Sequence, residues 1–228
     1  MSGSDEAPVA SAEAALRFVK PGQTLGLGTG RAAEAFVRAL GAQVAEGLDV
    51  RGVPTSVRTE ALARELGIPL LTLAEAGQLD VTFDGADEVD PHLDVIKGYG
   101  GALVREKIVA ASSNELVILV GEEKLVACLG ARGKLPVEVA AFGEALATRK
   151  LAELGCPSTR RESKPGEAYI TDNGHLILDC AVSDIQDPAD LEGQILGIPG
   201  VLGTGLFIAM ADAVIVQKGH DVEVRSRS

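Results

Sequence analysis

The chain has 228 residues, 46% hydrophobic and 24% charged, enough to bury the core of one large domain or of a domain that carries a smaller one. A net charge of −12, few aromatic residues and the lack of a long apolar run argue against nucleic-acid and membrane partners. Three scattered cysteines, three scattered histidines and an acidic N-terminus predict a cytoplasmic protein with free thiols and no metal site.

Through about residue 130, short apolar stretches alternate with amphipathic ones. Strands are expected at 23–28, 48–54, 68–73, 79–85 and 115–121. Helices are expected at 11–19, at 31–40 with a stop at Gly41, at 55–67 with Thr55 or Ser56 as N-cap, and at 101–113. Such alternation predicts a parallel, doubly wound sheet, while the first residues and 224–228 are expected to be loose ends.

The pattern then changes. Strands are expected at 134–140, 156–163, 168–182 and 200–209, and helices at 142–155 and 187–198. Asn173-Gly174 between alternating apolar residues is a strong hairpin signal. The order predicts a small split-βαβ domain, and the apolar strand at 211–219 is expected to return to the first sheet. We therefore expect one domain made of 1–130 and 204–228 and a second made of 131–203.

Three turns that precede predicted helices are rich in Gly, Thr or Ser. They are "GLGTGRAA" at 26–33, "VPTS" at 53–56 and "KGYGGAL" at 97–103. Ligands of open α/β sheets bind at such turns, where helix N-termini favour anions, so three together indicate a phosphate or carboxylate ligand. A dinucleotide is the weaker alternative, because the Gly28-x-Gly30-x-x-Ala33 spacing lacks an acid at the end of the second strand.

The stretch "FDGADEVDPHLDVIKGYGGALVREK" at 83–107 places five acids before the third turn. If Gly85 and Ala86 form a tight turn, Asp84 and Asp87 face one crevice; an acidic surface loop is the plainer alternative. Glu88, Asp90 and Asp94 are expected to be solvated loop charges.

Glu106 has apolar neighbours three and four residues away on its helix, a setting that raises the pKa of a carboxyl and suits a proton shuttle. A structural ion pair with Arg105 fits the same pattern equally well. Lys97 enters the glycine turn, where its ammonium could stabilise an oxyanion or bind phosphate, or simply be a surface charge.

Seven motifs occur in a specific order, namely "GLGTG", "PTS..T..LA.ELGIPL", "FDGADEVD", "KGYGGAL.REKIVA", "KLPVEV", "TDNGHLILD" and "PGVLGTGLF". With them, the chain resembles the type A family of ribose-5-phosphate isomerases over nearly its whole length. The resemblance implies a Rossmann-like doubly wound domain with a smaller α+β, ferredoxin-like domain inserted near its C-terminus. It also implies cofactor-free interconversion of ribose 5-phosphate and ribulose 5-phosphate by a homodimer or homotetramer.

Matched motif by motif, the resemblance assigns catalysis to Glu106 as the base, with Asp84 and Lys97. It assigns substrate binding to Thr29, Gly30, Arg31, Ala32, Asp84, Gly85, Ala86, Asp87, Lys97, Gly98, Tyr99, Gly100 and Lys124. The chain departs from the family where "GTGSTA" is "GTGRAA" and "KGGG" is "KGYG". We therefore expect Arg31 to replace two missing hydroxyl donors as a phosphate ligand.

Three other functions remain open. A sugar-phosphate-sensing module could share the scaffold, but it would not need Glu106 or Lys97. An isomerase for a different phosphosugar is made plausible by Arg31 and Tyr99. A hydride-shift isomerase would need a metal, and no cluster of suitable ligands stands out in the sequence.

Overall fold

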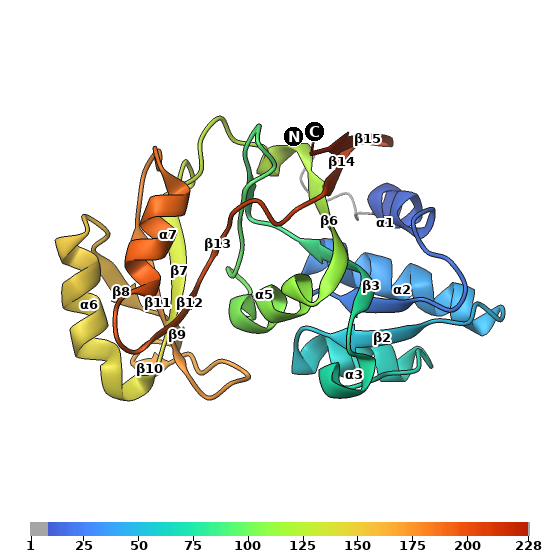
Figure 1. Cartoon of the computed structure of the whole chain (residues 1–228), viewed down its shortest axis with the longest axis horizontal. Coiled ribbons are helices and arrows are strands. Elements are labelled where there is room, and N and C mark those ends of the chain that lie inside the picture. The colour runs from blue at the N-terminus through green and yellow to red at the C-terminus, as the bar shows by residue number, and fades with distance from the viewer. Residues whose placement is uncertain (1–8, 228) are drawn as a thin grey trace. The chain divides into compact units, whose positions relative to one another are not determined.

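The computed structural model describes residues 9–227, which form two compact units (Figure 1). The larger unit contains the described residues up to Ala86, then Arg105–Lys124, and those from Met210 onward. The smaller unit contains Asp87–Val104 and Leu125–Ala209. This grouping differs from the division expected from the sequence at residues 87–104, 125–130 and 204–209, all of which belong with the smaller unit.

The larger unit is built on a six-stranded sheet with the order β15-β14-β6-β3-β1-β2. Its strands are β1 (Thr24–Leu27), β2 (Arg51–Pro54), β3 (Leu79–Gly85), β6 (Ser113–Gly121), β14 (Ala213–Lys218) and β15 (Asp221–Ser226). Every neighbouring pair is parallel except β14 and β15. The predicted parallel sheet and the return to it of the strand expected at 211–219, which is β14, are confirmed.

Helices cover both faces of this sheet. On one face α1 (Val9–Leu16), α2 (Arg31–Ala45) and α3 (Val57–Glu65) bury apolar side chains against β1, β3, β6 and β14. On the other face, α5 (Leu103–Ala111) places Val109 beside Val53 and Leu79, near the short helix α4 (Leu73–Ala76). The sequence pattern therefore gave the doubly wound arrangement correctly.

Three local expectations were wrong. Helix α2 does not end at Gly41 but continues through it. The glycine is explained by packing, because a Cβ added at this position would lie only 2.8 Å from the Cβ of Leu66. Segment 68–73 makes only one bridge, between Gly52 and Leu70, instead of a strand. Residues 224–226 are not loose but lie in β15. Of the expected N-terminal tail at 1–11, residues 9–11 lie in α1 and the others lie outside the described residues.

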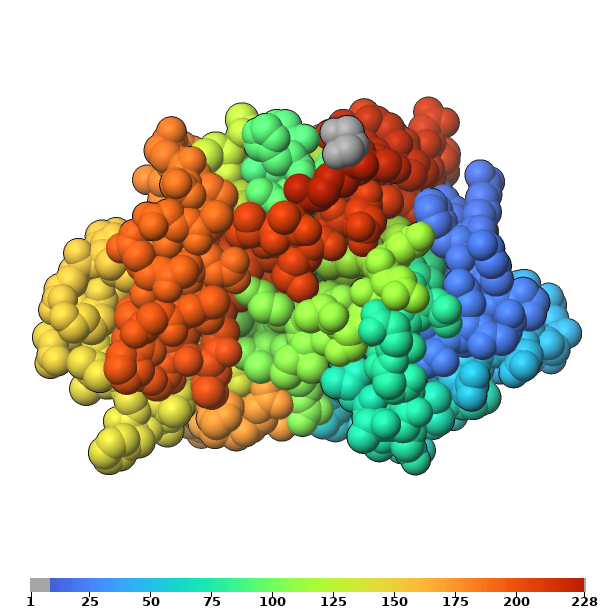
Figure 2. Space-filling view, in the orientation of Figure 1, coloured from blue at the N-terminus to red at the C-terminus, as the bar shows by residue number. Residues whose placement is uncertain are grey.

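The smaller unit has a four-stranded antiparallel sheet with the order β12-β7-β11-β8. Its strands are β7 (Lys134–Val139), β8 (Ser158–Arg160), β11 (Leu176–Ala181) and β12 (Val201–Thr204). Helices α6 (Glu144–Glu153) and α7 (Pro188–Leu196) pack on one face, and Figure 2 shows them side by side at the surface. This is the predicted split-βαβ arrangement.

Several short strands in the smaller unit either escaped prediction, as β4 and β5 did, or divide a stretch that was expected to be one strand. Strands β4 (Glu88–Val89) and β5 (Val95–Ile96) form a second sheet with β13 (Leu206–Phe207), and β9 (Glu162–Lys164) pairs with β10 (Glu167–Ala168). The expected Asn-Gly turn forms, with Gly174 at φ 80°, but it closes only a single bridge. All three cysteines are free thiols, and burial raises the pKa of the Cys180 thiol to about 12. Within residues 9–227, no helix has the length and apolar character needed to cross a bilayer.

Candidate active site

The carboxyl ends of three parallel strands of the larger unit lie level with one another. Leu27 at the end of β1 is in register with Pro54 of β2 and with Phe83 of β3. Because parallel strands end at one edge of a sheet, the turns that follow them share that edge, where open α/β sheets bind ligands. This brings together the first two predicted ligand turns and the start of the acidic stretch.

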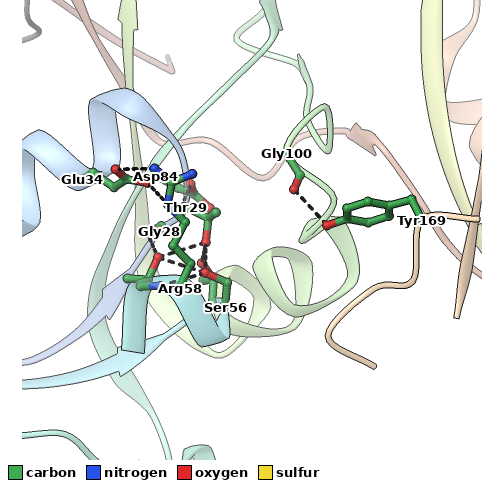
Figure 3. A network of polar contacts seen from close by, with 10 residues as sticks. Gly28, Thr29, Glu34, Ser56, Arg58, Asp84, Gly100 and Tyr169 are labelled. Carbon is green, nitrogen blue, oxygen red and sulfur yellow. Dashed lines mark hydrogen bonds and ion pairs between the residues drawn. The ribbon is translucent and has the colours of Figure 1, made fainter. Parts of the chain in front are cut away.

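Four hydroxyl groups meet at this edge (Figure 3). The Oγ1 atom of Thr29 lies 2.8 Å from Thr55 Oγ1, 2.8 Å from Ser56 Oγ and 3.1 Å from Thr59 Oγ1. Thr55, Ser56 and Thr59 are buried, so these hydroxyls must satisfy one another and nearby carbonyls. Thr59 Oγ1 donates to the Gly28 carbonyl at 2.9 Å and thereby ties α3 to the first turn.

Asp84 holds the same turn from the end of β3. Its Oδ1 accepts two backbone N–H groups, that of Thr29 at 3.1 Å and that of Gly85 at 2.7 Å. The side chain is 1% exposed, and a Cβ at Gly28 would collide with it. Asp84 therefore shapes the turn, a role that the sequence did not suggest for it.

Two helices begin at this cluster. Gly30, at φ 107°, is the N-cap of α2, and Ser56 is the N-cap of α3 and accepts the Thr59 N–H at 3.1 Å. Arg31 is exposed in the first turn of α2, while Glu34 of α2 pairs with Arg58 of α3 at 2.8 Å. Two helix N-termini, one of which has an exposed arginine in its first turn, suit an anion.

The remaining predicted residues of the larger unit lie near the ends of strands or on α5. Glu106 is 4% exposed on α5, among the buried side chains of Leu103 and Val109. Lys124, half-buried, ends the 3₁₀ helix Glu122–Lys124 that follows β6. Gly85, Ala86 and Ala32 are partly exposed.

In the smaller unit, the structure groups Asp87, Lys97 and the glycine turn. The N–H of Tyr99 donates to Asp87 Oδ2 at 2.9 Å, and the N–H of Asp87 donates to the Ile96 carbonyl at 2.8 Å. Lys97 is 2% exposed, and its ammonium lies 5.6 Å from the centre of the Phe207 ring. Asp87 is thus bound to the backbone of the turn that follows Lys97, and the surface-loop alternative does not describe it.

Tyr99 makes side-chain contacts that a glycine at this position could not make. Its hydroxyl donates to the Lys134 carbonyl at 3.2 Å, and the Lys134 ammonium lies 4.1 Å above its ring. Burial raises the pKa of Tyr99, so the hydroxyl stays protonated and remains a donor. Because Gly98 and Gly101 adopt φ of 100° and 89°, the turn bends at those glycines, while the Tyr99 side chain packs on β7.

The turn at 53–56, which contains Thr55 and Ser56, was expected to face a ligand, but neither residue was named as a substrate ligand and Thr59 was not singled out. The signal was present in the spacing P-T-S-x-x-T, which puts Ser56 at an N-cap and Thr59 one turn into the helix. Glu88, expected to be a solvated loop charge, is instead fully buried, and its two oxygens accept the N–H groups of Gly130 and Arg132 at 2.7 and 2.9 Å. It is a structural residue of the smaller unit.

Residues 51–221 match the family model described as ribose 5-phosphate isomerase A (phosphoriboisomerase A). The chain belongs to the ribose 5-phosphate isomerase A family. Its membership, predicted from the seven motifs, is confirmed by curated relatives of that name. The protein of Parvibaculum lavamentivorans is 50% identical over 96% of this chain and 97% of its own length, and that of Gloeobacter violaceus is 49% identical over 96% and 95%.

Solved structures of family members share the whole fold. The isomerase A of Methanocaldococcus jannaschii is 40% identical, with a TM-score of 0.93 over 99% of this chain and 100% of its own. A D-ribose-5-phosphate isomerase in complex with phospho-erythronic acid is 36% identical, with a TM-score of 0.95 and the same coverage. The predicted Rossmann-like fold with a smaller inserted domain is therefore confirmed.

Proposed function

We propose that this chain interconverts D-ribose 5-phosphate and D-ribulose 5-phosphate in the non-oxidative pentose phosphate pathway. The observation that carries the proposal is the 50% identity, over nearly the full length, to relatives named ribose-5-phosphate isomerase A. The anion-suited turn of the larger unit and the buried carboxyl of Glu106 support it chemically.

The reaction moves a proton between C1 and C2 of the open-chain sugar. Its barrier is the formation of an enediolate, which requires a base that removes a proton from carbon and groups that stabilise the developing oxyanion. In the forward direction the base takes the C2 proton of the aldose and the C1 carbonyl oxygen gains one. The C2 hydroxyl then loses its proton, and the base returns a proton to C1.

Glu106 is the proposed base. A carboxyl that is almost wholly buried on a helix is kept from bulk water, which suits a group that passes one proton between two adjacent carbons. Lys97 is the proposed cation that steadies the enediolate, together with backbone N–H groups of its glycine turn. Asp87 and Asp84 are proposed to hold sugar hydroxyls, and one of them relays protons when the sugar ring opens.

The 5-phosphate is proposed to bind the turn Thr29–Ala32. The N-termini of α2 and α3 favour an anion there, and Arg31 supplies a positive charge at a position where the family pattern has a hydroxyl. Lys124 is proposed as a further substrate ligand. No cofactor takes part in this proposal.

A coupled assay with ribose 5-phosphate tests the proposal, and other aldose phosphates run in parallel test the alternative of a different substrate. A protein that binds ribose 5-phosphate without turnover would instead be a sensing module. Reaction in D₂O with a chelator present distinguishes the enediolate mechanism from a metal-dependent hydride shift. Deuterium incorporation into product supports the enediolate, and loss of activity on chelation contradicts the metal-free mechanism.

We further propose that the enzyme is cytoplasmic and works as a homodimer or homotetramer. Light scattering coupled to size-exclusion chromatography measures the assembly directly, and a monomer at assay concentration would contradict this part of the proposal.

A further inference from the structure

Arg161, which lies between β8 and β9 of the smaller unit, holds two carbonyls of the glycine turn with one nitrogen. Its Nη1 donates to the Gly98 carbonyl at 2.9 Å and to the Tyr99 carbonyl at 3.1 Å. Its Nε and Nη2 donate to the two carboxylate oxygens of Asp179, at 3.0 and 2.5 Å. The fork on Asp179 fixes the plane of the guanidinium and leaves Nη1 for the turn.

The arginine is itself firmly anchored. Its side chain is 11% exposed and that of Asp179 is 17% exposed, so the pair is largely shielded from water. The N–H of Arg161 donates to the Ile177 carbonyl at 2.8 Å, and its carbonyl accepts the Tyr169 N–H at 2.9 Å. Because both the backbone and the guanidinium of Arg161 are held in place, its side chain can fix the position of the glycine turn.

Tyr169 holds the next carbonyl. Its hydroxyl donates to the Gly100 carbonyl at 3.3 Å, as Figure 3 shows, and its ring lies 5.8 Å from the Arg161 guanidinium carbon. Burial raises the pKa of Tyr169, so the hydroxyl remains a donor. A Cβ at Gly101 would strike this hydroxyl, which accounts for a second glycine at that end of the turn.

Three consecutive carbonyls, of Gly98, Tyr99 and Gly100, are thus fixed by two side chains from a distant part of the sequence. Because the N–H and C=O of a planar peptide point in opposite directions, a carbonyl that is held also aims the next N–H. The Gly98 carbonyl aims the Tyr99 N–H at Asp87, where it donates at 2.9 Å. The Tyr99 carbonyl, held by Arg161, turns the Gly100 N–H away from the guanidinium.

We propose that Arg161 and Tyr169 are positioning residues for the isomerisation, which hold the turn after Lys97 so that the Gly100 N–H faces the enediolate oxygen. This inference rests on the proposed function and deepens it. Neither side chain needs to touch substrate. They act by holding the Gly100 N–H in place, because stabilisation of the negative charge that develops on the enediolate requires donors that are already in position.

The decisive comparison is between two adjacent arginines. Arg161→Ala is expected to lower kcat about 100-fold, as a displaced catalytic group does, with KM changed much less. Arg160→Ala is the matched control, because Arg160 is 41% exposed and pairs only loosely with Glu144, at 3.6 Å. Millimolar methylguanidinium is expected to restore part of the kcat of Arg161→Ala and to leave Arg160→Ala unchanged.

Tyr169→Phe removes a single hydroxyl and covers the case in which Arg161→Ala does not fold. It is expected to lower kcat about 3- to 10-fold, the equivalent of one neutral hydrogen bond. The inhibition constant of inorganic phosphate should stay constant in every variant, because the proposed phosphate turn belongs to the other unit. Folded Arg161→Ala or Tyr169→Phe with wild-type kcat would overturn the proposal.

Hydrogen exchange of the peptide covering 97–103 gives a readout that needs no activity. Faster exchange in Arg161→Ala than in Arg160→Ala supports the clamp, and equal exchange overturns it. Should the wild-type protein fail to isomerise ribose 5-phosphate, the proposed function fails on the assay, while the exchange experiment still decides whether the two side chains hold the turn.

Discussion

The carboxylate of Asp84 accepts the backbone N–H of Thr29 at 3.1 Å, joining the end of β3 to the first turn of the sheet edge. The same oxygen takes the Gly85 N–H, so one acid orders two backbone segments. Gly28 leaves the space that this contact requires. The shape of the proposed phosphate turn therefore depends on an acid to which the sequence analysis assigned only catalysis and substrate binding.

Replacing Gly28 by alanine tests that dependence. The added Cβ would overlap Asp84 and the Phe83 carbonyl, so we expect a loss of about 1–3 kcal/mol in the free energy of unfolding. Gly193→Ala is the control: it lies in open space inside α7 and should gain about 0.5–1 kcal/mol. Urea unfolding measures both, and equal midpoints for the two variants would refute this account of Gly28.

Replacing Glu106 by glutamine removes the proposed base with almost no change in size. We expect a fall in kcat of about 10²–10⁴, the usual contribution of a positioned acid or base, with the fold intact. Glu65→Gln, an exposed acid at the end of α3, should have wild-type kinetics. Steady-state kinetics and circular dichroism check both variants, and a near-normal rate for Glu106→Gln would remove this residue from the base role.

Replacing Arg31 by alanine tests the departure from the family pattern. Loss of a charge-assisted contact to phosphate should raise KM roughly 10- to 100-fold and lower kcat much less. Arg38→Ala, an exposed position further along α2, controls for the loss of a positive charge from the same helix. An unchanged KM for Arg31→Ala would show that the two N-termini and hydroxyls hold the phosphate without it.

Glu138 gives a prediction about stability alone. It is fully buried in β7, and its Oε1 accepts the Thr171 hydroxyl at 3.0 Å and the Asn173 amide at 3.1 Å. Glu138→Ala removes this acceptor from the buried Thr171 hydroxyl and the half-buried Asn173 amide, and should cost about 1–3 kcal/mol of unfolding free energy. Glu138→Gln keeps an acceptor oxygen and should cost clearly less; equal losses in urea unfolding would contradict the role of the hydrogen bonds.

Much of the fold could be predicted because its signals are local. Strand β3 matches its expected bounds, and the apolar neighbours of Glu106 on its helix foretold its burial. Gly41 was wrongly predicted to end its helix, because the glycine is there to make room for Leu66, and such a contact leaves no local sequence pattern. Strands β4 and β5 have two residues each, too few to carry a periodic signal, and β5 also pairs with β13, more than 100 residues away in sequence.

The site was only partly predictable for the same reason. Asp87 and Lys97 follow recognisable motifs, and the structure places both beside the glycine turn. Arg161 and Tyr169 lie in "TRRESKPGEAY", a charged stretch that reads as solvent-exposed. Only the pairing of β8 with β11, which carries Asp179, brings the guanidinium to the turn.

The polypeptide passes between its two units four times, after Ala86, Val104, Lys124 and Ala209. Neither unit can therefore be excised, transplanted or expressed as one uninterrupted gene fragment. Deleting 125–209 would strip β5 of its pairing partner β13 and release the loop after Lys97 from Arg161 and Tyr169. Insertions, fusions and circular permutations of this scaffold are accordingly safer at surface connections within a unit than at any of the four crossings.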